Sequence, residues 1–269
     1  MSEMPEGITT ERVTAQREGS DIARVREYAI WARDVVARAF AESRGRSKII
    51  DTVSIKELKV EKGTILGIVG GLDSGLGTFF QLSTGNIRPD KGEFLLFGIK
   101  PALGRKDVGL ASYRFDLYGQ LTVHENLALL GELGLEAGVG KARIPEILDV
   151  LDIGDLANAK YRNLSESERR LVLLAQALLK EPTLMLVENI VQGLDMLESI
   201  RVIGALSKII NNGRDITYLI GTSFYDEDLF ALFTHIALVE QGRVTNSKRL
   251  VEQSPSAVRQ DIVAALSSI

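Results

Sequence analysis

The sequence of 269 residues contains no cysteine. This absence excludes disulfide bonds, thiolate metal ligands and cysteine nucleophiles, and it favours a cytosolic chain. An excess of basic charge is also lacking, because 32 Lys and Arg residues are set against 36 Asp and Glu residues, for a formal net charge of −4. A surface that binds a nucleic-acid backbone is therefore not expected.

Long apolar runs are lacking as well. No uninterrupted run approaches the roughly 18 residues of a membrane-spanning helix, and the first residues, MSEMPEGITTER, do not resemble a signal peptide. Any membrane role is therefore expected to come through a partner, with the chain cytoplasmic and peripheral to the membrane. The content of 45% hydrophobic and 25% charged residues is typical of a globular protein. Residues 1–27 are polar and without periodicity, which predicts an N-terminal extension before a domain of residues 28–269.

The pattern of apolar and polar residues changes along the chain. Residues 28–40 mix strand and helix patterns, residues 41–47 (AESRGRS) read as a loop, and residues 49–63 as two short strands, which predicts an antiparallel start. From Thr64 onwards apolar strands alternate with helical stretches, as in a mostly parallel sheet. Residues 114–180 are mainly helical and predict an inserted helical subdomain.

A glycine-rich turn follows the apolar stretch TILGIVG. Gly70 and Gly75 match the glycines of G-x-x-x-x-G-K-[ST], a loop whose backbone N–H groups cradle phosphates. Leu76 stands at the lysine position and Gly77 at the hydroxyl position, followed by Thr78. The missing lysine removes a contact worth about 1.5 to 3 kcal/mol, and Asp73 adds a negative charge to the loop. Affinity for phosphate is therefore expected to fall by about a hundredfold or more. Taken alone, the stretch is better explained as a plain tight turn.

Later segments strengthen this reading by their order and spacing. LYGQLTVHENL is followed by LSESERRLVLLAQALLKEPTLMLVENIVQGLD, and with the glycine-rich loop these stretches resemble the ATP-binding cassette (ABC) ATPases, the motor subunits of ABC transporters. The resemblance extends from about Tyr28 to about residue 250. It implies an α/β fold with a mostly parallel sheet of the P-loop NTPase type, an N-terminal antiparallel β subdomain and an inserted helical subdomain. It also implies a transmembrane permease partner and pairing of two cassettes, as a homodimer or a heterodimer.

The family's signature, L-S-G-G-Q, reaches the γ-phosphate bound by the opposite cassette. Here it reads LSESE, which keeps Ser165 and introduces Glu166 and Glu168. Two carboxylates facing a polyanion are expected to repel it, at about 4 kcal/mol for like charges 4 Å apart at an effective dielectric of 20. The alternative is that Ser165 and Glu168 form a capping box at a helix start.

The resemblance also assigns a magnesium-holding aspartate and a water-polarising glutamate to the end of the strand LMLV. Here these positions hold Glu188 and Asn189. Glu188 is a weak candidate for a metal ligand, whereas Asn189 cannot accept a proton as a carboxylate does. A solvated polar strand end is the simpler interpretation of Asn189.

At two further positions where the family has residues that contact the γ-phosphate, this sequence has other residue types. Tyr113 takes the place of the family's glutamine and Ser223 that of its switch histidine, so both γ-phosphate sensors are absent. His124 and His235 are expected to be structural or solvent-facing and do not replace them.

Two other positions keep part of the family pattern. Phe40 is the nearest candidate for the aromatic residue that stacks on adenine, although a buried core phenylalanine explains it equally well. Asp195 belongs to the stretch Gly193–Asp195, which matches the family's dimer loop, and a helix N-cap is the alternative or additional role.

Taken together, these replacements predict a degenerate cassette with little or no binding of ATP and magnesium. The leading hypothesis is a non-hydrolysing structural or regulatory subunit of a membrane complex, with a coupling surface near residues 113–125. One alternative is an ATP-using transporter subunit with residual activity, and another is a soluble scaffold no longer linked to transport.

Overall fold

The structure is a computed structural model, and it describes residues 26–43, 46–71, 73–102, 105–134, 139–212, 215–250 and 259–260. Side chains are described for these residues except 40–43, 46–50, 133–134 and 139–140. All but the last two residues of the expected extension, 1–27, therefore lie outside the described residues.

One sheet of ten strands runs through the described part of the molecule, in the order β4-β1-β2-β9-β8-β3-β7-β6-β5, with β10 paired to β8. An antiparallel section, β4-β1-β2, joins a parallel section, β8-β3-β7-β6-β5, through the short strand β9. The strands are β1 (Tyr28–Ser43), β2 (Arg46–Glu61), β3 (Ile65–Val69), β4 (Lys91–Leu96), β5 (Val108–Ser112), β6 (Leu184–Glu188), β7 (Thr217–Thr222), β8 (His235–Glu240), β9 (Arg243–Val244) and β10 (Lys248–Arg249).

The parallel strands consist of nearly continuous apolar residues because both of their faces are covered. Every residue of β6 and β7 is buried. Alternate side chains enter two separate cores, as the two-residue period of a strand requires: Met185 and Val187 pack on one face, and Leu184 and Leu186 on the other.

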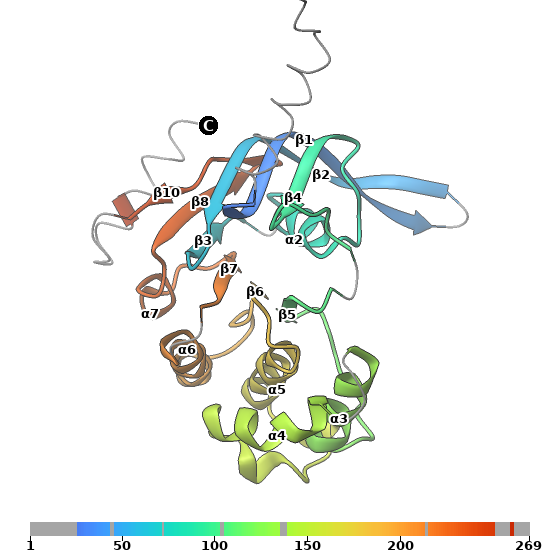
Figure 1. The fold of residues 1–269 in the computed structure, drawn as a ribbon, viewed down its shortest axis with the longest axis vertical. Helices are drawn as coiled ribbons and strands as arrows, with labels where there is room; N and C mark the ends of the chain where they lie inside the picture. Colours follow the sequence, from blue (N-terminus) through green and yellow to red (C-terminus); the bar gives the residue numbers. More distant parts are fainter. Residues whose placement is uncertain are drawn as a thin grey trace, which may run out of the picture.

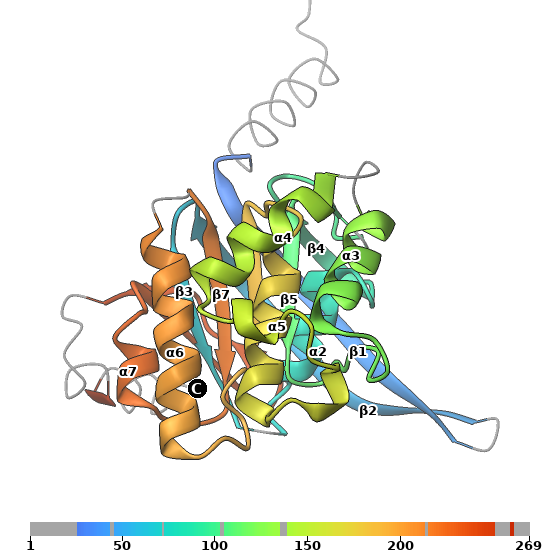
Figure 2. The same cartoon turned by 90° about the horizontal axis from the view of Figure 1, so that it is seen from below.

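Helices cover the two faces of the sheet. Helix α2 packs against β1, β2 and β6, whereas α5 packs against β5 and α6 on the opposite face. Figure 1 shows α3, α4 and α5 gathered at the end of the molecule away from β1 and β4, and in Figure 2, seen from below, the same helices lie in front of the sheet. These three helices lie within residues 114–180, the range in which the sequence predicts a helical subdomain. The helices are α2 (Leu76–Thr84), α3 (Val123–Gly134), α4 (Val139–Val150), α5 (Glu166–Leu178), α6 (Met196–Asn211) and α7 (Glu227–Phe230), with 3-10 turns at Gly154–Leu156 and Tyr161–Asn163.

The antiparallel start differs from its prediction in detail. The loop predicted at residues 41–47 is mostly strand, and the two short strands predicted at residues 49–63 belong to one strand of 16 residues, β2. β1 pairs with β2 along its length, with an irregularity between Ala39 and Phe40. The resulting hairpin extends beyond the rest of the sheet (Figure 1). Backbone pairing continues there, although the side-chain pattern is not that of a buried strand.

No helix within the described ranges combines the length and the apolar character that a membrane span needs.

Candidate phosphate-loop site

The loop between β3 and α2 has a shape that depends on its two glycines. Gly75 has a φ of 102°, in the left-handed region that L side chains rarely adopt. A β-carbon at Gly70 would overlap Ser74 Oγ and would lie 2.6 Å from the carbonyl oxygen of Val239. Both positions therefore require glycine, as the phosphate-loop pattern predicts.

Neighbouring segments of the protein hold this loop in place. The N–H of Gly242, in the turn after β8, donates to the carbonyl of Ser74 at 2.7 Å. A β-carbon at Gly75 would lie only 3.1 Å from the Cα atom of Gly242. The hydroxyl of Thr78 donates to Asp51 Oδ2 of β2 at 2.7 Å. The shape of the loop is thus maintained by contacts within the chain.

The residues at the lysine and hydroxyl positions begin helix α2. The N–H groups of Leu76, Gly77 and Thr78 have no acceptor within the helix, and the positive end of the helix dipole lies there. The side chain of Leu76 is 1% exposed and packs in the same core as Phe80. An apolar core contact thus replaces a cation at this position.

Glu188 ends β6 with a buried carboxylate whose two oxygens both have partners. Oε2 accepts from Ser112 Oγ at 2.6 Å, and Oε1 accepts from Arg114 Nε at 3.0 Å. Burial raises the pKa of Glu188, while the hydrogen bond from Ser112 and the charge of Arg114 act in the opposite direction. The carboxylate of Glu188 is thus hydrogen-bonded within the protein, to Ser112 and Arg114.

Asn189 is not the solvated strand end expected from the sequence. It is 3% exposed, and its Oδ1 accepts from the N–H of Ser223 at 2.8 Å. Asn189 and Ser223, which stand at the family's glutamate and histidine positions, are therefore hydrogen-bonded to each other. No hydrogen-bond partner of the buried Ser223 Oγ occurs among the described residues.

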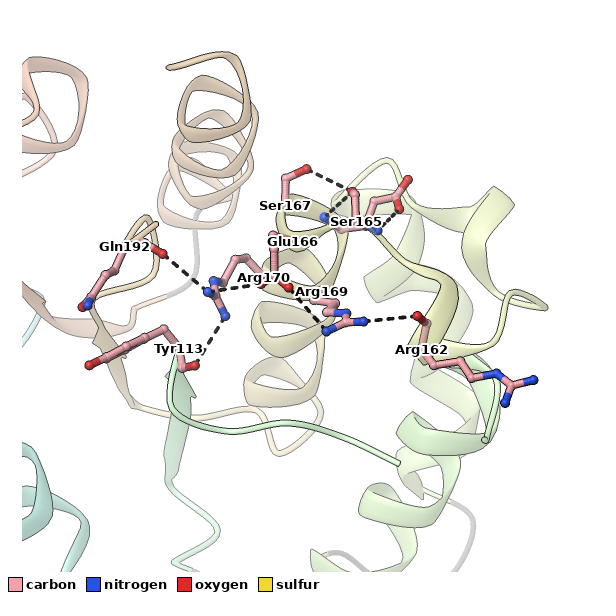
Figure 3. A network of polar contacts seen from close by, with 9 residues as sticks. Tyr113, Arg162, Ser165, Glu166, Ser167, Arg169, Arg170 and Gln192 are labelled. Carbon is pink, nitrogen blue, oxygen red and sulfur yellow. Dashed lines mark hydrogen bonds and ion pairs between the residues drawn. The ribbon is translucent and has the colours of Figure 1, made fainter. Parts of the chain in front are cut away.

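The capping box predicted at the signature is confirmed. Ser165 Oγ accepts from the N–H of Glu168, and the Glu168 carboxylate accepts from the N–H of Ser165, at 3.3 and 2.8 Å. The two glutamates also have arginine partners, which the sequence did not predict. Glu166 pairs with Arg169 and Arg170 at 3.4 Å each (Figure 3), and Glu168 lies 3.9 Å from Arg201. The repulsion expected from bare carboxylates is correspondingly reduced.

Arg170 connects the signature helix with the segment after β5. Its Nη1 donates to the carbonyl of Tyr113 at 3.4 Å, and its Nη2 to the carbonyl of Gln192 at 3.5 Å (Figure 3). Tyr113 in turn donates its N–H to the carbonyl of Glu188 at 3.2 Å. The structure thus brings together positions 113, 166 and 188, which lie far apart in the sequence.

Asp195 caps helix α6, as the simpler interpretation predicts. Its carboxylate accepts from the N–H of Glu198 at 2.9 Å, and Glu198 returns the contact, so that the two residues form a capping box. Phe40 lies in β1 opposite Ile49, but its side chain is outside the described part of the chain.

Neither histidine reaches the loop. His124 is exposed on α3, and His235 begins β8 with its Nδ1 3.1 Å from Thr234 Oγ1. Both therefore have the structural or solvent-facing positions expected of them.

A cavity of about 660 Å³ lies beside the loop, on the side of β8. Gly70, Gly71 and Asp73 line one wall, and Phe224 and Tyr225 another. Neither Glu188 nor the start of α2 belongs to its lining, so the cavity is separate from the strand-end carboxylate.

Sequence reasoning missed Arg114 and Arg170. The two arginines stand next to motif positions, Arg114 directly after Tyr113 and Arg170 within the signature helix. Their position next to the motifs is the signal in the sequence, but their partners lie 74 and 57 residues away, so only the fold brings them together.

Residues 53–191 match the family described as ABC transporter. The chain is 31% identical over 255 residues to the methionine import ATP-binding protein MetN of Mesorhizobium japonicum, covering 91% of this chain and 66% of that protein. It is 25% identical over 205 residues to the linearmycin resistance ATP-binding protein LnrL of Bacillus subtilis, covering 74% and 64%. The chain thus spans slightly less than two thirds of the length of these relatives.

The fold is that of solved ATP-binding cassettes. The structure of cbiO1 from Clostridium perfringens, part of the ABC transporter complex cbiONQ, superposes with a TM-score of 0.68 at 18% identity. The match covers 87% of this chain and 91% of that structure. On the sequence match and the shared fold, this chain belongs to the ABC transporter family, with the architecture of its ATP-binding cassettes.

Proposed function

We propose that this chain is a degenerate ATP-binding cassette that does not hydrolyse ATP and acts as a structural or regulatory subunit of an ABC transporter-like membrane complex. In this role it lies at the cytoplasmic side of a transmembrane permease and pairs with a second cassette. The observation that carries the proposal is the engagement of Asn189 with Ser223.

The groups that would activate water are absent or engaged. Asn189 has no basic group, and its amide oxygen already accepts the N–H of Ser223. Ser223 offers a hydroxyl where the family has an imidazole. Catalysis of phosphoryl transfer depends on positioning water and on stabilising charge, and these residues supply neither.

The residues around the loop do not fit magnesium-ATP. Leu76 is packed in the core, Gly77 has no hydroxyl, and the hydroxyl of Thr78 donates to Asp51. These features support weak or absent binding of ATP and magnesium.

An exposed aromatic surface supports the partner role. Phe115 and Tyr118 are 54% and 59% exposed, in the segment that leads from β5 to α3. Large exposed apolar side chains in a cluster are typical of interaction sites. This segment coincides with the coupling surface expected at residues 113–125.

The alternative, an ATP-using subunit with residual activity, is favoured by the preserved loop. Gly70 and Gly75 keep the backbone shape of a phosphate cradle, and the N–H groups at the start of α2 are free of intrahelical acceptors. The two candidates differ in whether nucleotide stabilises the fold.

Phosphate release and thermal unfolding in the presence of magnesium-ATP test the proposal. We expect no hydrolysis above the buffer rate and no increase in Tm, because a ligand raises Tm only where it binds the native state. An increase in Tm at millimolar nucleotide that disappears in Glu188→Ala would refute non-binding, and hydrolysis would refute the proposal itself.

A repaired loop provides the positive control. In Leu76→Lys/Gly77→Thr the glycine frame is unchanged, so we expect nucleotide binding to return. The new β-carbon at position 77 would lie 2.9 Å from Arg114 Nη2, the far end of a flexible side chain that can move aside.

Gentle purification tests the membrane complex. An integral-membrane permease should remain bound to the chain and should be lost in Phe115→Ser/Tyr118→Ser. Purification without any membrane protein would instead support the soluble scaffold.

A further inference from the structure

The guanidinium of Arg114 lies between the strand-end carboxylate and the start of helix α2. Its Nε donates to Glu188 Oε1 at 3.0 Å. Its Nη2 covers Gly77, where a β-carbon would lie only 2.9 Å from it. Arg114 therefore bridges two positions that belong to different elements and lie far apart in the sequence.

These two positions have a specific meaning in a phosphate-loop site. In P-loop NTPases the hydroxyl of the loop and the carboxylate at the strand end together hold Mg²⁺. Here the corresponding residues are Gly77 and Glu188, and a guanidinium occupies the space between them. We propose that Arg114 is a built-in cation that takes the place of Mg²⁺ and excludes a divalent metal from the site. This inference deepens the proposed function and rests on it.

Local contacts direct Arg114 towards this position. Ser112 Oγ accepts from the N–H of Arg114 at 3.2 Å and donates to Glu188 Oε2 at 2.6 Å. The Arg114 guanidinium also lies 5.3 Å from the centre of the Tyr113 ring. The turn after β5 thus directs the side chain towards the carboxylate.

The chemistry of the donor set opposes a metal. Mg²⁺ requires about six oxygen ligands in near-octahedral geometry. Both oxygens of Glu188 are engaged, and Gly77 provides no ligand. A guanidinium has only donors and stays protonated, so it cannot ligate a cation and repels one.

Burial makes the positive partner necessary. The side chain of Glu188 is 6% exposed, whereas that of Arg114 is 49% exposed. A buried carboxylate is costly unless an opposite charge or hydrogen bonds compensate for it. Arg114 and the hydroxyl of Ser112 together provide the compensation, and Arg114 alone contributes a positive charge. The absence of a side chain at position 77 leaves room for it.

An ordinary ion pair is the competing interpretation. In that case Arg114 contributes to stability alone, and its removal leaves the metal affinity of the chain unchanged. The two interpretations differ in a measurement that does not depend on ATP hydrolysis.

The experiment measures binding of Mn²⁺, as a probe for Mg²⁺, to the full chain by electron paramagnetic resonance. The variants are Gly77→Ser, Arg114→Ala/Gly77→Ser, this pair with Glu188→Gln, and Arg162→Ala. Arg162→Ala is the matched control, since it removes the same charge from an exposed side chain. A second variant, Arg114→Gln/Gly77→Ser, retains a polar side chain if the alanine variant unfolds.

We expect wild type and Arg162→Ala to show no Mn²⁺ binding that depends on Glu188. Removing a like charge from the site should make Mn²⁺ binding by Arg114→Ala/Gly77→Ser about tenfold or more tighter than by Gly77→Ser. Glu188→Gln should abolish this gain. Equal Mn²⁺ affinity in Gly77→Ser and Arg114→Ala/Gly77→Ser would overturn the proposal, whether that affinity is measurable or not.

The outcome can be separated from that of the proposed function. Hydrolysis of ATP by wild type would refute the proposed function. Binding of Mn²⁺ through Glu188 in a wild-type chain without hydrolysis would refute only the role of Arg114.

Discussion

Asn189 combines an unusual backbone conformation with a buried hydrogen bond. Its φ is 47°, in the left-handed region that Asn adopts more readily than most residues, and its Oδ1 accepts the N–H of Ser223. Asparagine suits position 189 because it tolerates the left-handed backbone conformation and because its side-chain oxygen reaches the N–H of Ser223.

Two substitutions separate these contributions. Asn189→Gly removes the acceptor but tolerates the conformation, and it should lower the free energy of unfolding by about 1 to 2 kcal/mol. Asn189→Ala should cost about 0.5 to 1 kcal/mol more, because backbone strain exceeds the entropy that glycine gains on unfolding. Urea unfolding measures both, and equal values for Ala and Gly would contradict a role for the backbone conformation.

Asp107 provides a test by pH. The Arg105 guanidinium, which donates its Nε to Asp107 Oδ1 at 2.8 Å, lowers the pKa of the carboxyl. A lowered folded-state pKa contributes stability that is present above the unfolded value of about 3.9 and is lost as the pH falls through the folded value. For this partly exposed pair we expect Asp107→Asn to cost about 0.5 to 1 kcal/mol at neutral pH.

The loss of unfolding free energy in Asp107→Asn should become smaller as the pH is lowered below about 4. Denaturant unfolding at several pH values measures it. Glu57→Gln is the control, since its carboxylate pairs with Lys59 at the surface and salt should remove its effect. A cost for Asp107→Asn that does not change with pH would rule out the ion pair as its source.

At the residue scale, sequence predicted the features that local rules decide. The glycines of the loop and the caps at Ser165 and Asp195 follow from backbone conformation and short-range hydrogen bonds. The roles of Arg114 and Asn189 depend on partners that only the fold supplies. The family motifs indicated that Asn189 replaces a glutamate, but they did not predict what Asn189 or Arg114 contacts.

At the scale of elements, helix α5 connects the helical subdomain with the sheet. Its Arg170 is 9% exposed and contacts the carbonyls of Tyr113 and Gln192 as well as Glu166. A single side chain therefore joins the segment after β5, the segment after β6 and the start of α5.

Replacing Arg170 with an apolar side chain of similar length should weaken the contact between the start of α5 and the segments after β5 and β6, called the α5 junction below. In Arg170→Met we expect faster amide hydrogen exchange around Tyr113 and Gln192, measured by mass spectrometry, because carbonyl partners are lost. Arg201→Met removes a more exposed arginine 3.9 Å from Glu168 and should leave exchange there unchanged. Similar exchange in both variants would mean that Arg170 does not hold the α5 junction.

The hairpin shows where element-level prediction fails. Side-chain patterns report burial, whereas strand pairing requires only backbone donors and acceptors. The polar stretch AESRGRS therefore reads as a loop, although β1 continues to Ser43 and β2 begins at Arg46. The parallel strands are predictable for the opposite reason, since burial on both faces leaves continuous apolar runs.

At the scale of the whole molecule, an apolar patch is exposed beside the segment Gly193–Asp195. Met196, Leu197 and Ile200 of α6 are 74%, 72% and 50% exposed and follow directly after the cap at Asp195. Exposed apolar side chains grouped on one helix surface are typical of a contact with another protein.

We expect this patch to mediate pairing of cassettes. Wild type should show concentration-dependent association in sedimentation experiments, and Met196→Ser/Leu197→Ser/Ile200→Ser should remain monomeric with an unchanged Tm. The corresponding change at Ile99, which is 59% exposed outside α6, is the control. Association that persists in the triple variant would assign pairing to another surface.

The two residues of β9 join the two sections of the sheet, pairing with Ser54 and Ile55 of β2 on one side and with β8 on the other. Because β9 follows β3 to β8 in the sequence, β2 keeps an open edge during synthesis until all of these elements and β9 itself have emerged from the ribosome. Open edges invite pairing with other chains. Until β9 pairs with it, the edge of β2 in the nascent protein is thus open to pairing with other chains.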